Sequence, residues 1–392
     1  MLFTHILPPV CFIKSNFLIL IPLHSIIKQV IKLKKTSLLL IGLLLLGCAP
    51  KEKKLYNDST MQAGFDTVIS IQLYADSQEE FDETFQKATD AFLYYNSLFD
   101  KYNDYDVANI KTINDNAGIQ PVEVSQVIID MLLLSKQYSE LSNYQFDVTL
   151  GPVLSLWHDV REKALNGDDY TLPTEEQLQS ARACSGWDKV EIDDENNTVY
   201  LNQSCASLDV GAVAKGYATQ LVTEMLLEEG YVNGFVNAGG NVEFLGNKIN
   251  GDLWRAGILT PSLHNSTESL ITLELGGQEA FVTSGDYQRY FIHDGNIMHH
   301  IIDPDTLYPA RHAKSVTILC EDSGIADILS TTLYTMTYQE GAAYLEKLKE
   351  NGIEAEAIWI YDKTDEIENE DYREKEGYYI LTTPNIASKI IN

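Results

Sequence analysis

A short apolar run near the N-terminus indicates which part of this chain belongs to the folded protein. The run Ser37–Leu46 follows a lysine-rich stretch, residues 32–35, and leads directly into Gly47 and Cys48. It is too short to span a bilayer. A basic stretch, an apolar run and a small residue before cysteine are typical of a signal peptide cleaved before a lipidated cysteine. We therefore expect residues 1–47 to be removed and Cys48 to anchor the protein on the extracytoplasmic face of the cell membrane. An uncleaved anchor helix is the alternative.

The residues upstream of about Val30 are surplus to such a signal. They contain a second apolar run, Phe17–Ile27, which Pro22 interrupts. Our interpretation is that translation starts later, between Val30 and Leu33. We expect residues 48–62 to be the lipidated cysteine and a linker, and residues 63–392 to be a domain with a large core.

The net charge of the chain limits the classes of molecule that it is expected to bind. Of 28 basic and 57 acidic residues, five basic and no acidic ones lie in residues 1–47, which leaves 23 basic against 57 acidic residues, a net charge of −34. Such an acidic protein is not expected to bind nucleic acid. A site for a phosphorylated ligand would depend on a metal ion or on a few well-placed Lys and Arg side chains.

Hydrophobic periodicity predicts a mixture of strands and helices. Strands are predicted at residues 67–74, 207–210, 235–245, 270–275, 315–320 and 354–361, with hairpins over 189–202 and 287–303. Helices are predicted at residues 79–99, 124–141, 212–229, 324–336 and 339–351, with a short helix inside 143–157 and a helix start at 173–176. The expected fold class is α+β (mixed α/β), a single large domain of two tightly joined lobes.

A glycine-marked turn leads from a predicted strand into a predicted helix at Leu208–Tyr217, with Lys215 in the first helical turn. Helix N-termini surrounded by small residues bind phosphate, and a lysine adds a point charge. The segment is neither a Walker A loop nor a dinucleotide-binding GxGxxG motif. A plain strand-to-helix turn with a surface lysine is the alternative.

Asp327 and Thr331 lie four residues apart, so they share one face of a predicted helix. One carboxylate and one hydroxyl suit Mg2+, which keeps waters and takes further ligands from substrate phosphates. A solvated helix face is the alternative interpretation.

A third group of polar residues flanks the predicted hairpin at residues 287–303. Ser284 and Gly285 precede it, and His299 and His300 lie near the end of its return strand. Adjacent strand residues point to opposite faces, so at most one histidine faces a given site. A histidine there can take a proton from an attacking hydroxyl, although a strand-edge histidine without a role is equally compatible with the pattern.

The cysteines leave two readings open. Apart from Cys11 and Cys48 the chain has Cys184, Cys205 and Cys320, at spacings that fit no zinc or iron–sulfur pattern. A Cys184–Cys205 disulfide in an oxidising compartment and three buried thiols are both possible.

Taken together and in order, motifs between about residues 63 and 350 resemble the ApbE-type FAD:protein FMN transferases. They are FDTVISIQLYA, FDKYND, FDVTLGPVLSLW, LDVGAVAKGYA, VNAGGNVEFLG, TSGDYQRYF, HHIIDPDTLYP and ADILSTTLYTM. The resemblance implies an enzyme that, with Mg2+, transfers FMN from FAD to a Ser or Thr hydroxyl of an acceptor protein and releases AMP. FAD and the metal would lie in a cleft between the lobes.

The resemblance also implies roles for individual residues. His300 would activate the acceptor hydroxyl, and Asp327 would serve catalysis as a metal ligand together with Thr331 and the Ala212 carbonyl. FAD would contact Tyr102, Gln145, Phe146, Asp147, Asp209, Lys215, Ser284, Gly285 and Ile302.

The chain departs from the family pattern at two places. Phe65 stands where many members have Met, and Thr306-Leu307-Tyr308-Pro309 lacks the usual glycine, which puts the shape of that turn in doubt. The family's acceptors carry a motif in which Gly-Ala separates two Ser/Thr residues, and this chain has none. The expected acceptors are therefore other proteins, membrane redox subunits of the Rnf or Na+-translocating NADH:quinone oxidoreductase type. An FAD pyrophosphatase, a non-catalytic FAD-binding lipoprotein and a solute-binding lipoprotein are the alternatives.

Overall fold

The computed structural model describes residues 52–263, 268–287, 289–365, 367 and 371–392. Lys53–Asn392 form one compact unit. The predicted signal peptide and Cys48 therefore lie outside the described residues, and their processing stays a prediction. Within the described part, no helix combines the length and the apolar character that a membrane crossing needs.

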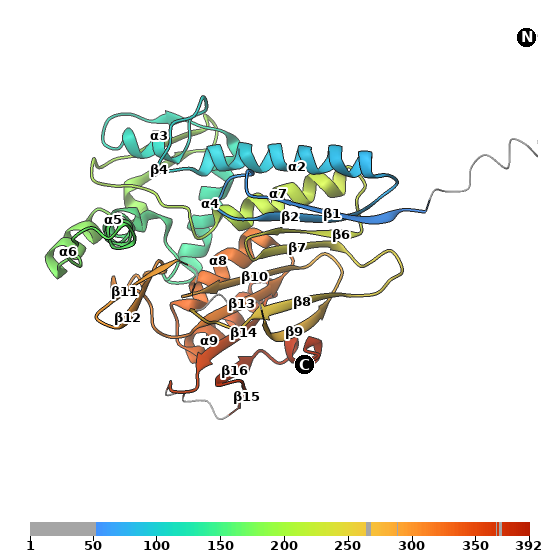
Figure 1. Ribbon diagram of the computed structural model, residues 1–392. Coiled ribbons are helices and arrows are strands. Elements are labelled where there is room, and N and C mark those ends of the chain that lie inside the picture. Colours follow the sequence, from blue (N-terminus) through green and yellow to red (C-terminus); the bar gives the residue numbers. More distant parts are fainter. Residues whose placement is uncertain (1–51, 264–267, 288, 366, 368–370) are drawn as a thin grey trace, which may run out of the picture. The chain divides into compact units, whose positions relative to one another are not determined.

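A nine-stranded antiparallel sheet organises this unit (Figure 1). Its strands follow the spatial order β1-β2-β6-β7-β10-β13-β14-β16-β15. Their bounds are β1 Lys54–Thr60, β2 Ile69–Ala75, β6 Gly234–Ala238, β7 Asn241–Gly246, β10 Ala280–Gly285, β13 Ser315–Cys320, β14 Glu356–Asp362, β16 Tyr378–Thr382 and β15 Arg373–Lys375.

Helices cover one face of the sheet. They are α2 (Gln78–Phe99), α4 (Gln126–Leu141), α7 (Ala214–Glu228), α8 (Ser323–Tyr334) and α9 (Tyr338–Glu350). The other face is covered by the hairpin β8 (Trp254–Leu259) and β9 (Ser269–Leu275) and by the 3-10 turn η3 (Ile386–Lys389). Strand residues alternate between the two layers: Val282 and Trp359 belong to the helical core, whereas Phe281 and Ile358 pack against the hairpin side. Both faces are thus buried, which explains the nearly continuous apolar sequence of β13 and β14.

A second, smaller group of helices and strands lies beside the nine-stranded sheet (Figure 1). It contains α3 (Ile110–Asp115), the three-stranded sheet β3 (Val122–Glu123), β5 (Thr198–Leu201) and β4 (Val190–Asp193), α5 (Gly151–Asn166), α6 (Glu175–Ala183), the 3-10 turns η1 (Val148–Leu150) and η2 (Trp187–Lys189), and the hairpin β11 (Tyr290–His293) and β12 (Asn296–His299). A separate apolar cluster, including Trp157, Phe291 and Met298, fixes the hairpin against α5.

Most predicted elements are confirmed, and the fold class is α+β in a single domain as expected. Three predictions differ. Residues 235–245 are two strands, because Gly239 and Gly240 adopt positive φ and turn the chain back on itself. Residues 207–210 form no strand, because Leu208 pairs its N–H and C=O with the Asn114 side chain. The expected linker at 48–62 contains β1, which pairs with β2 through its backbone although its side chains are mostly exposed.

The acidic segment at residues 366–376 contains the edge strand β15, and part of the segment lies outside the described residues. Cys184 and Cys205 form a disulfide, so of the two readings of the cysteines the structure selects the first. Cys320 is free and buried.

Candidate active site

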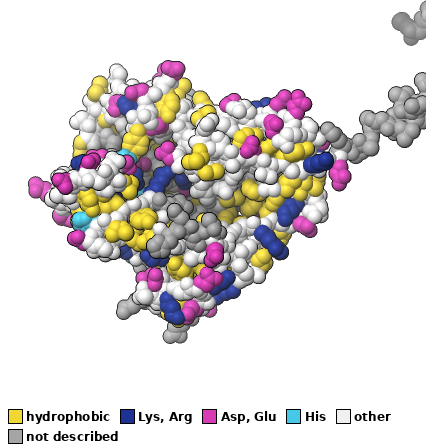
Figure 2. Space-filling model, in the orientation of Figure 1, with side chains coloured by type: hydrophobic (Ala, Val, Ile, Leu, Met, Phe, Trp, Pro, Cys, Tyr) yellow, Lys and Arg dark blue, Asp and Glu magenta, His cyan; other side chains and the backbone are white. Residues whose placement is uncertain are grey.

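A cavity of about 600 Å3 brings the predicted site residues together. Figure 2 shows a hollowed face with Lys and Arg side chains gathered within it. The cavity is lined by residues from the segment before β2, the end of α2, η1, α5, the start of α7, the end of β10, the β11–β12 hairpin and α8. All predicted catalytic, FAD-contacting and metal residues line it: Tyr102, Gln145, Phe146, Asp147, Asp209, Ala212, Lys215, Ser284, Gly285, His300, Ile302, Asp327 and Thr331.

Asp327 is the buried carboxylate on the cavity floor. Its Oδ2 accepts a hydrogen bond from the Gly216 N–H at 2.9 Å, and its Oδ1 lies 3.7 Å from Lys215 Nζ. A Cβ on Gly216 would approach the Ser323 carbonyl oxygen to 2.2 Å, so only glycine lets α7 and α8 come this close. Burial raises the pKa of Asp327, and the charge of Lys215 only partly offsets that rise.

Asn241, the first residue of β7, links the same two side chains. In the amide orientation that satisfies both neighbours, its oxygen accepts from Lys215 Nζ at 2.7 Å and its nitrogen donates to Asp327 Oδ1 at 3.3 Å. The Lys215 ammonium is therefore held at the N-terminus of α7, where the helix dipole adds to its charge. This arrangement attracts an anion to the floor of the cavity.

Thr331 lies one helical turn after Asp327, and its Oγ1 is 3.4 Å from Ser284 Oγ, which is 2.8 Å from Ser330 Oγ. Among the described residues no group of three or more His, Cys, Asp and Glu side chains could hold a metal ion. The donors at hand are oxygens only, from Asp327, Thr331 and the Ala212 backbone. Such a sparse oxygen set fits Mg2+, which completes its shell with water and phosphate oxygens.

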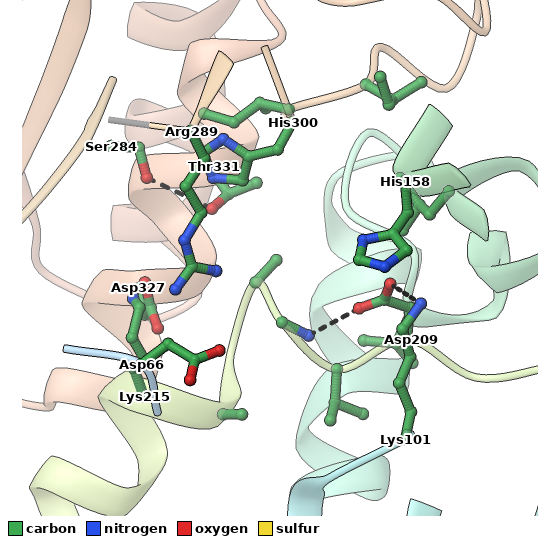
Figure 3. Close-up of a pocket in the computed structure, with 18 of the residues that line it drawn as sticks. Asp66, Lys101, His158, Asp209, Lys215, Ser284, Arg289, His300, Asp327 and Thr331 are labelled. Atoms are coloured by element: carbon green, nitrogen blue, oxygen red, sulfur yellow. Dashed lines mark hydrogen bonds and ion pairs between the residues drawn. The ribbon is translucent and has the colours of Figure 1, made fainter. Parts of the chain in front are cut away.

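Asp209 lies across the cavity and pairs with Lys101. The Asp209 Oδ2 to Lys101 Nζ distance is 2.6 Å, and Asp209 Oδ1 accepts from the Gly211 N–H at 3.0 Å. Burial alone would raise the pKa of Asp209, but the Lys101 charge and these hydrogen bonds hold it below its ordinary value. Asp209 is therefore a charged, positioned acceptor (Figure 3).

An aromatic stack stands next to this pair. The rings of Tyr102 and His158 lie 4.9 Å apart, and Lys101 Nζ lies 4.9 Å from the Tyr102 ring centroid. Arg161 Nη2 is 3.0 Å from His158 Nδ1. Burial, followed by the charges of Arg161 and Lys101, lowers the pKa of His158, so the ring is neutral at pH 7. The exposed face of Tyr102 offers a stacking surface for a planar ring.

Gln145 supplies a buried acceptor beside this surface. Its Nε2 donates to Asp305 Oδ2 at 2.7 Å, while its Oε1 is buried and has no hydrogen-bond partner among the described residues. Buried acceptors are normally satisfied, so this oxygen is available to an N–H group of a ligand.

The side chains of His299 and His300 have different surroundings, as expected for adjacent residues at the end of a strand. His299 is buried, with Nε2 2.6 Å from the Ala310 carbonyl oxygen and Nδ1 accepting from the Ile301 N–H at 3.2 Å. His300 follows directly and keeps an accessible surface on the cavity. Partial desolvation of the ring against the cavity wall, followed by the charges of Arg289 and His299, lowers the pKa of His300. The ring is therefore neutral at pH 7 and can accept a proton.

Comparisons with known proteins identify the family of this chain. A sequence model of the ApbE family matches residues 65–356, most of the chain. The chain belongs to the ApbE family. It is 29% identical over 303 residues to an FAD:protein FMN transferase of Klebsiella pneumoniae, covering 76% of this chain and 87% of that protein. It is 30% identical over 311 residues to the FAD:protein FMN transferase of Vibrio cholerae, covering 78% of this chain and 88% of that protein.

Solved structures agree on the fold. The crystal structure of the ApbE protein from Thermotoga maritima superimposes with a TM-score of 0.70 at 27% identity, covering 86% of this chain and all of that one. The flavin transferase ApbE of Vibrio cholerae gives a TM-score of 0.67 at 23% identity and covers 86% and 99% of the two chains. The resemblance drawn from the motifs is confirmed at the level of family and fold.

The two departures from the ApbE pattern leave the local backbone in an unusual region. Phe65 and Asp66 have φ of 58° and 49°, and Leu307, in place of the usual glycine, has φ of 62°. Leu307 therefore keeps the left-handed conformation that glycine adopts freely. Its carbonyl oxygen accepts from Trp157 Nε1 at 2.8 Å, which ties this turn to α5.

Sequence reasoning missed several residues that line or support the ApbE-family cavity. Lys101 stands beside the predicted Tyr102, and Arg289 stands within TSGDYQRYF, so both lay inside motifs already singled out. His158 and Arg161 follow FDVTLGPVLSLW at helical spacing. Asn241 lies within the motif VNAGGNVEFLG, but its link to Lys215 and Asp327 follows only from the pairing of β6 with β7 as a hairpin.

Proposed function

We propose that this ApbE-family enzyme is a Mg2+-dependent FAD:protein FMN transferase that acts on a Ser or Thr hydroxyl of an acceptor protein and releases AMP. One observation carries the proposal. A single cavity joins the oxygen donors of Asp327 and Thr331, the anion-attracting Lys215 at a helix start, and the solvent-accessible His300. Phosphoryl transfer needs this combination, because it depends on positioning and on neutralising charge.

The Ala212 carbonyl, Asp327 and Thr331 would hold the metal. When bound, Mg2+ would neutralise charge on the pyrophosphate of FAD and on the departing AMP. The carboxylate of Asp327 suits this task because Gly216 and Asn241 hold it in one orientation.

The reaction proposed for the cavity is one displacement at phosphorus. The acceptor oxygen forms a bond to the FMN-side phosphorus of FAD, and the bond from that phosphorus to the bridging oxygen breaks. AMP leaves with the bridging oxygen, and His300 takes the proton of the hydroxyl. The pyrophosphate brings negative charge beside His300, which raises its proton affinity from the low value of the empty cavity.

The remaining cavity residues fit the two ring systems of FAD. Tyr102 offers a ring face, Phe146 and Ile302 are buried apolar neighbours, and Gln145 Oε1 offers an acceptor for a ring N–H. Asp209 is a negatively charged acceptor for hydroxyl or N–H groups, and Asp147 adds a carboxyl whose Oδ1 also accepts from the Thr149 N–H. Such groups orient the flavin so that its phosphate meets the metal site.

We further propose that the acceptors are membrane redox subunits of the Rnf or Na+-translocating NADH:quinone oxidoreductase type. The enzyme would reach them from a lipid anchor at Cys48. Mass spectrometry of the processed protein tests the anchor directly, since a diacylglyceryl group on Cys48 changes the mass of the N-terminal peptide. A mature N-terminus elsewhere would rule this location out.

The transferase is tested by mass spectrometry of an acceptor subunit incubated with the enzyme, FAD and Mg2+. The acceptor should gain the mass of FMN, and the gain should disappear with Asp327→Ala or His300→Ala. Release of AMP and free FMN without a labelled acceptor would instead identify an FAD pyrophosphatase, in which water takes the place of the hydroxyl. Bound FAD without turnover would identify a carrier.

A further inference from the structure

Arg289 brings to the cavity a positive charge that the described residues do not neutralise. Lys101 pairs with Asp209 at 2.6 Å, Lys215 lies 3.7 Å from Asp327, and Arg161 contacts His158 and Glu162 at 3.0 and 3.3 Å. For Arg289 no ion pair or hydrogen bond is found with any described residue. In a chain with 57 acidic and 28 basic residues, such a side chain in a cavity is free to bind an anionic ligand.

The Arg289 guanidinium lies among the side chains that the proposed reaction uses. Figure 3 shows it directed into the cavity, with His300 and Thr331 on one side and Asp66 and Asp327 on the other. Arg289, His300 and Asp327 all line the same cavity. The proposed base and the proposed metal carboxylate therefore share one cavity with the guanidinium.

The hairpin register fixes where Arg289 stands relative to His300. Tyr290 pairs with His299 in the β11–β12 ladder, so Arg289 and His300 are the next residues outward on the two strands. Phe291 and Met298, the pair after Tyr290 and His299, are buried against α5 and hold the hairpin in place. Arg289 and His300 are thus presented side by side by one rigid element.

We propose that Arg289 is a catalytic residue that binds the phosphoryl group of FAD being transferred. This inference rests on the proposed function and extends it to a residue outside the predicted site. In the displacement written above, the attacked phosphorus lies between the hydroxyl held at His300 and the oxygen leaving toward the metal site. Arg289 stands between these two groups, and its planar donors match two non-bridging oxygens of one phosphate. It donates hydrogen bonds and exchanges no proton.

The test compares Arg289→Gln and Arg289→Lys with wild-type enzyme in the full chain. We expect Arg289→Gln to lower kcat for FMN transfer by about 10³-fold, the lower range for an arginine that stabilises phosphoryl transfer, with a much smaller change in KM for the acceptor. Arg289→Lys should keep part of the activity, and guanidinium ion should partly restore Arg289→Ala. Arg255→Gln, an exposed arginine on β8 paired with Glu274, is the control that should behave as wild type.

A binding measurement separates this inference from the proposed function. Titration with FAD, riboflavin and inorganic pyrophosphate should show Arg289→Gln weakening the two phosphate ligands and leaving riboflavin unchanged. This comparison holds even if wild-type enzyme transfers no FMN. Wild-type kcat in Arg289→Gln, a loss confined to acceptor KM, or equal weakening of riboflavin would each overturn the assignment. The second outcome would make Arg289 an acceptor contact, and the third a structural residue.

Discussion

Lys101 and Asp209 form a 2.6 Å ion pair between segments 108 residues apart in the sequence. The pair joins the end of α2 to the segment that leads into α7, and both side chains are largely buried. Asp209 is further fixed by its N–H, which donates to the Val148 carbonyl oxygen at 2.8 Å. Three parts of the cavity wall therefore meet at Asp209.

Replacing Lys101 alone should destabilise the protein more than replacing both Lys101 and Asp209. Lys101→Met leaves Asp209 charged and unpaired, which we expect to cost roughly 3 kcal/mol of unfolding free energy. Lys101→Met/Asp209→Asn removes the charge as well and should recover a large part of that loss. Urea unfolding of the single and double variants at pH 7 measures the coupling. Simple additivity of the two single variants would contradict a direct interaction.

The same pair predicts an acid sensitivity. The pKa of Asp209 is lower in the folded protein than in the unfolded chain, where it is about 4. Its contribution to stability is therefore complete above that unfolded value and is lost as the pH falls through the folded value. Asp209→Asn should flatten this part of the stability curve below pH 4, measured by urea unfolding, whereas an unchanged curve would show that the pair adds nothing.

His299 should act on catalysis only through His300. His299→Phe keeps a ring in the buried site but removes the hydrogen bonds to Ala310 and Ile301 that fix the end of β12. We expect kcat for FMN transfer to fall by roughly 10–100-fold with little change in FAD affinity, because a small displacement of a positioned base is costly. His312→Ala, outside the cavity, is the matched control. A parallel loss of FAD binding would show instead that the whole hairpin has moved.

We expect the buried side chain of Glu243 to make the protein less stable as the pH rises toward about 8. It is a buried carboxyl on β7, and burial, with Asp322 and Glu224 nearby, raises its pKa to about 8. A raised pKa means that the stabilising, protonated form is fully present below the unfolded value and is lost as the pH rises through about 8. Between these limits the cost is at most roughly 3–5 kcal/mol.

Glu243→Gln should therefore stabilise the protein at pH 8 relative to wild type and have little effect at pH 5. Thermal unfolding at the two pH values measures the difference. Glu346→Gln, on the exposed side of α9, is the control and should change neither value. Equal effects of Glu243→Gln at both pH values would mean that packing, and not ionisation, controls this site.

The Cys184–Cys205 disulfide should contribute to stability without taking part in catalysis. It closes a loop with a sequence separation of 21 residues around the β4–β5 hairpin, for which chain entropy predicts about 3 kcal/mol. Cys184→Ser/Cys205→Ser should lower the unfolding temperature and leave kcat near the wild-type value. Adding a reductant should affect wild type and not the double variant. A fall in kcat on reduction would mean that the bond also positions Asp209.

The amino-acid sequence by itself determined the family and most of the element types, and it named residues that line one cavity. This was possible because periodicity and short motifs are local properties: a glycine turn leads into a helix within Leu208–Tyr217, and Asp327 and Thr331 share a helix face by spacing alone. Only the tertiary structure decided which charges meet. The Lys101–Asp209 pair, the Asn241 bridge and the position of Arg289 in the cavity depend on the packing of segments far apart in the chain, and no local pattern encodes the distance between them.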